Sequence, residues 1–581
     1  MRAHMRPRIA MLAFLAAIWA LIFLPKLADR EVTSIIEARV GITAREMWRA
    51  GEWVLPTMNG ELRLQKPPLS YWAVQALSWL RGTWDDATLR LPFALFALGA
   101  VGFTHAMGLR LGGASRGFLA GVILLTSALF VKSGRTASAD VALLFCVAGS
   151  WYFYVAARLA DRAFLRVMLW IFLGLGILAK GPVVLAVVLL PMFVEAAVAR
   201  SLRPFGPLWS PVGILAFLAL SLAWPAQVIF RLSGEMPATE AIHRWYLESF
   251  GKILPSDGID EGYKFQRHAG PFYFYLLRFP AVIGFWTAIL VPWAVGWLRE
   301  GKPFRQLARL REGDPEILAP LWALTTLVFF SLISEKKTAY LLPILPATSL
   351  WLARTIEDGF KAWRGQIGRG ASWLAIVAGS LITLTLWTTL AGVPAWAQTL
   401  LPFDFEQIAE RIFSHAGWVS LGLCALGFAT FLLLKPALRA SGPLPAIVLV
   451  GSALGIGGFL YDELRDRVEP QTVFRKAGRE AQQATLGASQ AAALGNLPAG
   501  LLYYADRIVK TYDWRNTAGL QCLPSTDRVL VRDRALERLG IPTPGNVGQH
   551  LAPPLDRFEV LGWIEAGTDA EKDSILVLAA R

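Results

Sequence analysis

Charge is scarce in this sequence. Only 17% of its 581 residues are Asp, Glu, Lys or Arg, whereas 55% are hydrophobic. This balance excludes an ordinary soluble domain and indicates a polytopic membrane protein. The net charge of +14 is compatible with a nucleic-acid partner, but Lys and Arg also collect in cytoplasmic loops and fix membrane topology. We favour the second explanation and expect no nucleic-acid partner.

Cysteine and histidine are also rare. Of the three cysteines, Cys146 and Cys424 lie in apolar stretches and Cys522 stands alone, which excludes a disulfide framework or a cysteine-bound metal. The six histidines form no metal-ligating triad. His105 and His415 lie in or beside apolar segments, and we expect them to have structural roles.

Long apolar runs, by contrast, fill most of the chain. A membrane helix needs about 20 apolar residues, and segments of roughly that length predict an all-α membrane protein with about 13 transmembrane helices. No small-residue cleavage site precedes Lys26, so we expect the first helix to be retained. The two short segments around Lys180 leave a count of twelve open. The expected spans are 9–25, 89–109, 114–131, 139–157, 164–182, 183–199, 209–230, 272–297, 316–334, 338–354, 372–393, 414–434 and 443–461.

Basic residues alternate with these spans as the positive-inside tendency requires. The N-terminus is therefore expected in the cytoplasm of a bacterial cell and the C-terminus outside it. We divide the chain into a transmembrane part, residues 1–464, and an extracytoplasmic part, residues 465–581. The transmembrane part contains two long outer loops, 26–88 and 231–271.

Several cations break this pattern, because they lie in short turns on the outer side. A charge near the membrane interior is costly, roughly 2.5–3.5 kcal/mol at the bilayer centre, so a cluster of cations favours an anionic partner. The alternative is snorkelling of single long side chains to the interface. We favour a shared phosphate site. The outer cations are Lys66, Lys132, Arg135, Lys180, Arg267, Lys336 and Lys337.

The first outer loop contains a helical pattern. Apolar residues recur at helical spacing at Ile36, Val40, Ala44 and Met47. The charged residues Glu37, Arg45 and Arg49 fall on other faces, so we expect an amphipathic helix that lies along the membrane surface. Gly51 is expected to end this helix, and the segment VLPTMNG to make a turn.

The composition changes after about residue 465. QTVFRKAGREAQQATLGASQAAALG predicts an amphipathic helix, and GLLYYADRIVK, DRVLVRD and DSILVLAAR predict strands. We therefore expect a small α/β domain on the outer face. It contains no Gly-rich phosphate loop or catalytic cluster, and we interpret it as a packing or docking domain.

Six segments carry a family resemblance: EARVGITAREMWRAGEWVLPTMNG (37–60), KPPLSYW (66–72), GRTASAD (134–140), GILAKGP (176–182), RHAGPFYFY (267–275) and SEKKTAYLLPILPA (334–347). In this order they resemble the bacterial GT-C glycosyltransferases that use polyprenyl-phosphate sugars, specifically the group of the lipid A aminoarabinose transferases. Protein O-mannosyltransferases are more distantly similar. The resemblance implies transfer of a monosaccharide, with inversion, to an envelope acceptor on the outer face of the cytoplasmic membrane.

The resemblance implies a donor-phosphate site built from lysine and arginine. The leaving group is a polyprenyl phosphate, whose developing charge must be stabilised. Lys66 is the implied phosphate contact, and the prolines Pro67 and Pro68 hold it on a stiff turn; the alternative is that they only break the chain before it re-enters the membrane. Further candidate phosphate ligands are Arg135, Lys180, Lys336 and Lys337.

Glu37 is the candidate catalytic carboxylate. The family has an Asp–Glu pair here, but this chain has Ile36 before Glu37, and Gln65 replaces the family's glutamate before the KPP lysine. Because hard cations need carboxylate oxygens, these departures favour a metal-free site without cofactor. Glu37 acts as a base aligned by Arg39, or it only pairs with Arg39 or Arg45.

The remaining candidates come from the same segments. Asp140 matches a family acid and would orient the sugar or Arg135; the alternative is a helix N-cap, with Ser138 as competitor. Aromatic residues in or directly after the second outer loop, such as Trp245 and Phe272, form a lid, stack on a sugar ring or belong to an interfacial belt, and we favour the belt. The implied substrate contacts are Arg39, Gln65, Tyr71, Arg267, His268 and Tyr340.

Rival functions stay open at this point. A transporter of lipid-linked sugars would also contain many spans and buried cations, but has no need of the large first loop. A noncatalytic lipid-binding relative is made credible by Ile36 and Gln65. A protein O-glycosyltransferase differs only in its acceptor. We favour a glycosyltransferase whose acceptor is lipid A or another glycolipid, by analogy with the family.

Overall fold

A computed structural model describes most of the first 364 residues and parts of the C-terminal region. The described ranges are 2–25, 27–234, 270–283, 308–333 and 335–364, then 474–486, 491–494, 499–506, 509–512, 528–532, 558–565 and 574–580, with a few isolated residues between them. The predicted spans 372–393, 414–434 and 443–461 lie outside these ranges.

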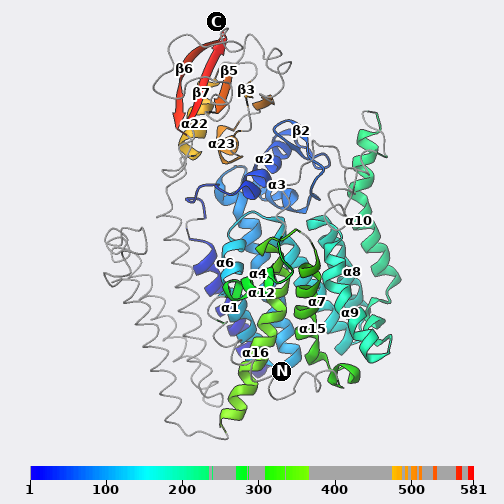
Figure 1. Ribbon diagram of the computed structural model, residues 1–581. Coiled ribbons are helices and arrows are strands. Elements are labelled where there is room, and N and C mark those ends of the chain that lie inside the picture. Colours follow the sequence, from blue (N-terminus) through cyan, green and yellow to red (C-terminus); the bar gives the residue numbers. More distant parts are fainter. Residues whose placement is uncertain are drawn as a thin grey trace, which may run out of the picture.

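Helices form the main body of the described chain. Their bounds are α1 (Arg2–Phe23), α4 (Asp86–Gly112), α5 (Ala114–Leu125), α6 (Ala128–Gly134), α7 (Ala139–Leu159), α8 (Ala163–Lys180), α9 (Val183–Ala199), α10 (Pro211–Leu232), α12 (Phe274–Ile283), α15 (Leu318–Leu332) and α16 (Leu345–Arg364). Short 3₁₀ segments η4 (Pro315–Ile317) and η5 (Thr338–Ile344) precede α15 and α16. Figure 1 shows these helices side by side, with α16 running to one end of the bundle.

The described residues contain five helices that are long and apolar enough to cross a membrane, or six if the bent pair α5 and α6 counts as one span. The helices of that pair meet at an angle of 66°, because the chain breaks between Leu125 and Ala128. The span predicted over 114–131 therefore corresponds to this bent pair. The short helices α8 and α9 follow each other closely around Gly181 and Pro182, as the sequence predicted.

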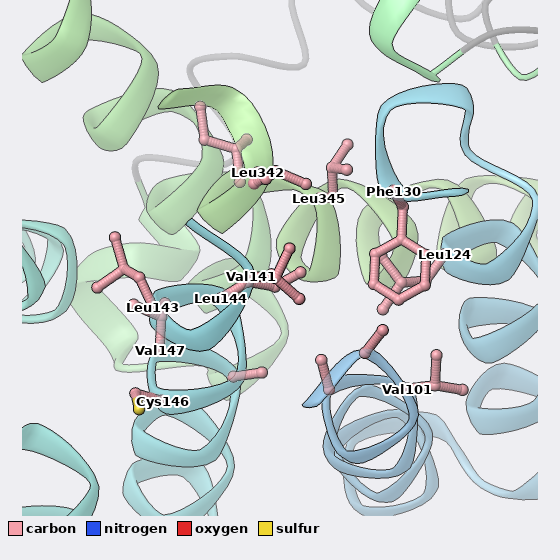
Figure 2. Packing of buried hydrophobic residues seen from close by; sticks show 14 of the residues in the cluster. Val101, Leu124, Phe130, Val141, Leu143, Leu144, Cys146, Val147, Leu342 and Leu345 are labelled. Atoms are coloured by element: carbon pink, nitrogen blue, oxygen red, sulfur yellow. The ribbon is translucent and has the colours of Figure 1, made fainter. Parts of the chain in front are cut away.

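The core lies where α4, α5, α6, α7 and the start of α16 meet. Figure 2 shows Val101, Leu124, Val141 and Leu345 directed toward one another from these helices. Small residues permit the closest contact: a Cβ on Gly108 of α4 would lie 2.5 Å from the Cα of Gly117 on α5. Close backbone approach of this kind is typical of helix pairs in membranes.

The first outer loop folds into α2 (Ile35–Ala50), a hairpin of β1 (Thr57–Met58) and β2 (Glu61–Leu62), and α3 (Leu69–Arg81). Gly51 ends α2 in the left-handed conformation, as predicted. Asn59 and Gly60 both have positive φ and make the hairpin turn. The Glu46 carboxylate fixes this turn, because it accepts hydrogen bonds from the Asn59 and Gly60 backbone.

The predicted orientation of α2 is wrong in part. Val40, Ala44 and Met47 are buried as expected, but Ile36 is 47% exposed. Glu37 is fully buried and Arg45 is 7% exposed, although both were assigned to the polar face. The reason is that both charges have ion-pair partners on other elements: Arg90 pairs with Glu37, and Asp506 pairs with Arg45.

The C-terminal part contains a mixed sheet of five strands in the order β4-β3-β5-β7-β6. Its elements are α22 (Phe474–Ala484), β3 (Ala491–Leu494), α23 (Ala499–Ala505), β4 (Val509–Tyr512), β5 (Arg528–Arg532), β6 (Phe558–Glu565) and β7 (Ser574–Ala580). We call these elements the C-terminal unit. In Figure 1 the sheet lies at one end of the molecule, beyond α23 and α2.

One predicted strand of this unit is wrong. GLLYYADRIVK divides into helix α23 and the first residues of β4. Leu501 and Tyr503 of α23 are buried, and an apolar run of this length does not distinguish a short helix from a strand. The strands predicted from DRVLVRD and DSILVLAAR correspond to β5 and β7.

Candidate active site

Glu37 lies at the centre of a buried network at the start of α2. The Arg90 guanidinium of α4 donates to both oxygens of the Glu37 carboxylate, at 2.7 Å from Nε and 3.2 Å from an η nitrogen. The Ala137 backbone N–H donates to the same carboxylate at 3.2 Å, and Arg30 lies 3.9 Å away. Arg90 is therefore the main partner of Glu37, in place of the Arg39 or Arg45 that the sequence suggested.

Asp140 pairs with Lys180. The two residues occupy the first turn of α7 and the last turn of α8, and the Lys180 ammonium donates to the Asp140 carboxylate. The same ammonium lies 4.5 Å from the ring centroid of Tyr340. Ser138 is the N-cap of α7, since its hydroxyl accepts from the Asp140 backbone N–H. The Asp140 side chain therefore does not cap α7, and its carboxylate binds Lys180.

Two further lysines lie beside this pair. Lys337 forms an ion pair of 2.5 Å with Glu335, which also contacts Tyr340. The Lys336 ammonium donates to the backbone carbonyls of Phe330, Ser331 and Ile333 at the end of α15. Burial lowers the pKa of Lys336. We call Lys180, Lys336, Lys337, Asp140, Glu335 and Tyr340 the lysine cluster.

Arg135 faces the end of α1. Its guanidinium donates to the carbonyl of Ile22 at 3.0 Å and to that of Pro25 at 2.9 Å, and its side chain is buried. Nearby, Arg30 donates to the Thr136 hydroxyl. In this arrangement Arg135 holds the 134–137 segment beside α1 and thereby places the Ala137 N–H that contacts Glu37.

Lys66 lies in a half-buried bend between β2 and α3, with Gln65 before it. Leu64 and Leu69, which flank this bend, pack in one apolar cluster with Leu178 of α8. Because Leu178 precedes Lys180 by two residues, this packing brings the bend toward the end of α8. The fold therefore gathers the KPP segment and the lysine cluster at the same end of the bundle.

The other predicted substrate contacts occupy different surroundings. Tyr71 is buried in α3, and Arg39 is exposed on α2. Arg267 and His268, like Trp245, lie outside the described residues. The chain returns beside the lysine cluster at Gly270, where an added Cβ would lie 2.8 Å from the Lys336 side chain.

Three residues of this site were not predicted from the sequence. In the sequence, Arg90 is an ordinary cation at the start of a predicted span. Glu335 only precedes a lysine pair, and Tyr275 is one aromatic residue among many. The Tyr275 hydroxyl accepts from the Lys337 backbone N–H at 3.1 Å. The available sequence signal for Arg90 was an arginine inside a predicted membrane span, because a charge in that position needs a partner.

The residues present do not fit a divalent cation at Glu37. Among the described residues, no three His, Cys, Asp or Glu side chains are placed to share a metal ion. Both oxygens of Glu37 already accept from Arg90, and Ile36 and Gln65 supply no carboxylate. We derive no catalytic step through a metal.

Comparison with known proteins identifies relatives along most of the chain. The family model described as dolichyl-phosphate-mannose-protein mannosyltransferase matches residues 65–224. Undecaprenyl phosphate-alpha-4-amino-4-deoxy-L-arabinose arabinosyl transferase from Pectobacterium carotovorum is 26% identical over 465 residues, which are 79% of this chain and 77% of the relative. The enzyme of the same name from Serratia proteamaculans is 26% identical over 70% of each chain.

Solved structures share the fold. ArnT from Cupriavidus metallidurans in the apo state superposes with a TM-score of 0.69 at 18% identity, over 99% of this chain and 98% of the other. The crystal structure of that protein bound to undecaprenyl phosphate gives a TM-score of 0.67 at 19% identity, over 98% and 97% of the two chains. The helical GT-C class predicted from the motifs is confirmed.

Proposed function

We propose that the chain is a membrane glycosyltransferase, like the aminoarabinose transferases to which it is similar, and that it moves a monosaccharide from a polyprenyl phosphate to a cell-envelope acceptor. Lipid A or another glycolipid is the favoured acceptor, by analogy with the family that the sequence motifs resemble. The names of the relatives give the lipid-linked sugar and not its acceptor. The reaction takes place on the outer face of the bacterial cytoplasmic membrane, with the N-terminus in the cytoplasm and the C-terminal unit outside.

The lysine cluster is the observation that carries this proposal. Three lysines meet two carboxylates there, so the cluster keeps an excess of positive charge at the end of the bundle. When the bond between the sugar C1 and the phosphate oxygen breaks, the electron pair goes to the phosphate. Lys66, Lys180 and Lys337 would stabilise this developing charge as point charges.

Arg135 and Lys336 have a supporting part in this proposal. Their N–H groups are directed at backbone carbonyls rather than at an open space. A phosphate would have to displace those carbonyls to reach them. We therefore assign direct phosphate contact first to Lys66, Lys180 and Lys337, and assign Arg135 and Lys336 to the placement of the loops that carry the site.

Glu37 would accept the proton of a hydroxyl acceptor, while the acceptor oxygen attacks C1 from the face opposite the leaving phosphate. Its contacts with Arg90 and Ala137 fix the carboxylate in one orientation. Asp140 would hold Lys180 in place and orient the sugar. An acceptor phosphate, already ionised, would not need the base, because only orientation is then required.

The test uses the purified full chain in lipid nanodiscs with a panel of polyprenyl-phosphate sugars and a membrane lipid extract. Wild-type protein should release polyprenyl phosphate and label a lipid. Lys66→Ala should reduce transfer by about 10²–10³-fold, the usual loss when one transition-state charge contact is removed, whereas Lys66→Arg should keep part of the activity. Lipid binding without turnover would favour the noncatalytic relative. Donor movement across the bilayer of sealed proteoliposomes, without transfer, would favour a transporter.

The role of Glu37 is tested in the same assay with Glu37→Gln, which keeps the shape and removes the charge. A base contributes about 10²–10⁴ in rate, so a loss of that size identifies a hydroxyl acceptor. An unchanged rate would assign Glu37 to the ion pair with Arg90 alone. Arg39→Gln tests the alignment role that the sequence suggested for Arg39, and it should keep the rate because Arg90 is the main partner of Glu37.

A further inference from the structure

The segment between α1 and α2 is held from two sides by guanidinium groups. From α4, Arg90 donates to the carbonyls of Leu27, Arg30 and Glu31 while it binds Glu37. From the C-terminal unit, Arg475 of α22 donates to the carbonyls of Ala28, Asp29 and Arg30 at 3.2–3.4 Å. Segment 27–31 thus connects the C-terminal unit with the residue that orients Glu37.

Asp86 joins the same two parts of the molecule. Its carboxylate accepts from the hydroxyls of Tyr503 and Tyr504, each at 2.9 Å, and pairs with Arg475 at 2.9 Å. Asp86 and Arg90 are one helical turn apart at the start of α4. The first turn of α4 therefore makes both contacts. Asp86 binds the C-terminal unit, and Arg90 binds Glu37.

The tyrosines suit this role chemically. Burial, and then the Asp86 charge, raise the pKa of Tyr504 to about 12, so its hydroxyl stays protonated and donates to Asp86 at neutral pH. The Tyr504 hydroxyl also accepts from the Val32 backbone N–H at 2.8 Å, directly after segment 27–31. Tyr503 lies against Gly41 of α2, where an added Cβ would come within 2.6 Å of the ring.

We propose that Arg475, Tyr503 and Tyr504 of the C-terminal unit are positioning residues for the Glu37 carboxylate, acting through Asp86, Arg90 and segment 27–31. The C-terminal unit then has a part in catalysis beyond packing, although it contributes no group to the reacting atoms. This inference rests on the function proposed above, in which Glu37 serves the transfer reaction.

The test combines transfer kinetics with amide hydrogen exchange of peptides that cover residues 27–37 in the full chain. Arg475→Gln and Asp86→Asn should raise exchange in that segment. They should lower kcat by about tenfold or more, because small misplacements of a catalytic group cost up to about 10² in rate. The KM for the donor should stay within about twofold, because these residues make no phosphate contact.

Matched controls separate positioning from general damage. Arg479→Gln removes an exposed arginine from the same helix, α22, and should change neither exchange nor kcat. Tyr504→Phe removes one hydroxyl without loss of volume and should show an intermediate effect. Gly41→Ala displaces the Tyr503 ring from the opposite side and should raise exchange in the same segment.

The outcomes distinguish this inference from the proposed function. If wild-type protein transfers sugar and the Arg475→Gln and Asp86→Asn variants raise exchange but keep kcat, the contact is structural only and the positioning role is wrong. Unchanged exchange in 27–37 would overturn it as well, even if activity fell. If wild-type protein transfers no sugar with any donor, the proposed function fails, and the exchange data still decide whether the C-terminal unit orders segment 27–37.

Discussion

The two ends of α15 carry charge in opposite ways. At its start, three arginines meet four carboxylates: Arg116, Arg309 and Arg354 contact Asp314, Glu316, Glu357 and Asp358. We call this group the arginine cluster. At the other end of the helix, about 22 Å away for 15 residues, the lysine cluster has three cations and two carboxylates.

The difference separates a structural cluster from a candidate binding site. Each arginine of the arginine cluster is bound by two carboxylates, so the charges there are neutralised inside the protein. Lysine, a flexible point charge, predominates at the other end. There Lys336 is bound by carbonyls, which do not cancel its charge. An excess of cations within a membrane protein calls for an anion.

Among the changes that test this comparison of the two clusters, the largest effect is expected when a lysine is removed from the lysine cluster. Lys180→Ala should reduce kcat/KM by about 10²-fold, because the charge that faces the leaving phosphate is lost. Lys180→Arg is the matched control and should retain activity in part. Donor release kinetics measure both. A variant Lys180→Ala with wild-type kcat/KM would remove the contrast between the two clusters.

A change in the arginine cluster should affect folding instead. Glu316→Gln leaves Arg116, Arg309 and Arg354 without one partner each and should lower the free energy of unfolding by about 2–3 kcal/mol, as expected for a partly buried charge that loses its partner. Thermal unfolding in detergent measures this loss. Activity per folded molecule should equal that of wild type, and a selective loss of kcat would contradict the structural assignment.

A smaller effect is expected from a carboxylate of the lysine cluster. Glu335→Gln removes the negative charge that lies 2.5 Å from Lys337. The affinity for the donor phosphate should rise by about two- to fivefold, since partly exposed pairs are worth about 1 kcal/mol or less. Binding of polyprenyl phosphate, measured by tryptophan fluorescence, tests the direction. Weaker binding would show that Glu335 itself contacts the ligand.

The smallest expected effect concerns metal removal. EDTA should leave the transfer rate unchanged within error, because the lysines supply the positive charge and Glu37 is bound to Arg90. Added Zn²⁺ or Mg²⁺ after EDTA gives the matched series. A rate that falls with EDTA and returns with one of these ions would show that a metal takes part.

The sequence predicted the fold class and much of the first loop. The Gly51 end of α2 and the turn after it follow from local chemistry, since a left-handed residue and an Asn-Gly turn need only neighbouring residues. The cations of the lysine cluster were identified from the placement of charges, and the KPP segment from the family resemblance. Their assignment to phosphate contact stays a prediction.

The partners of those charges were not predictable in the same way. Glu37 and Arg90 are 53 residues apart, and Asp86 and Tyr504 are separated by 418. Helical periodicity predicted that Glu37 lies away from the apolar face of its helix. The periodicity of one helix contains no information about a buried partner on another helix. The same limitation hid the contact of Arg135 with the end of α1.

The contact between Asp86 and the C-terminal unit also fixes an order of events. A chain is synthesised from its N-terminus, so α4 and the first loop are complete and inserted long before Arg475 and Tyr504 exist. Until those residues emerge and dock, segment 27–31 has only one of its two guanidinium supports. A nascent or truncated chain would therefore occupy the membrane with its lysines in place but with Glu37 incompletely held, and it would reach its full transfer rate only after the C-terminal unit has docked.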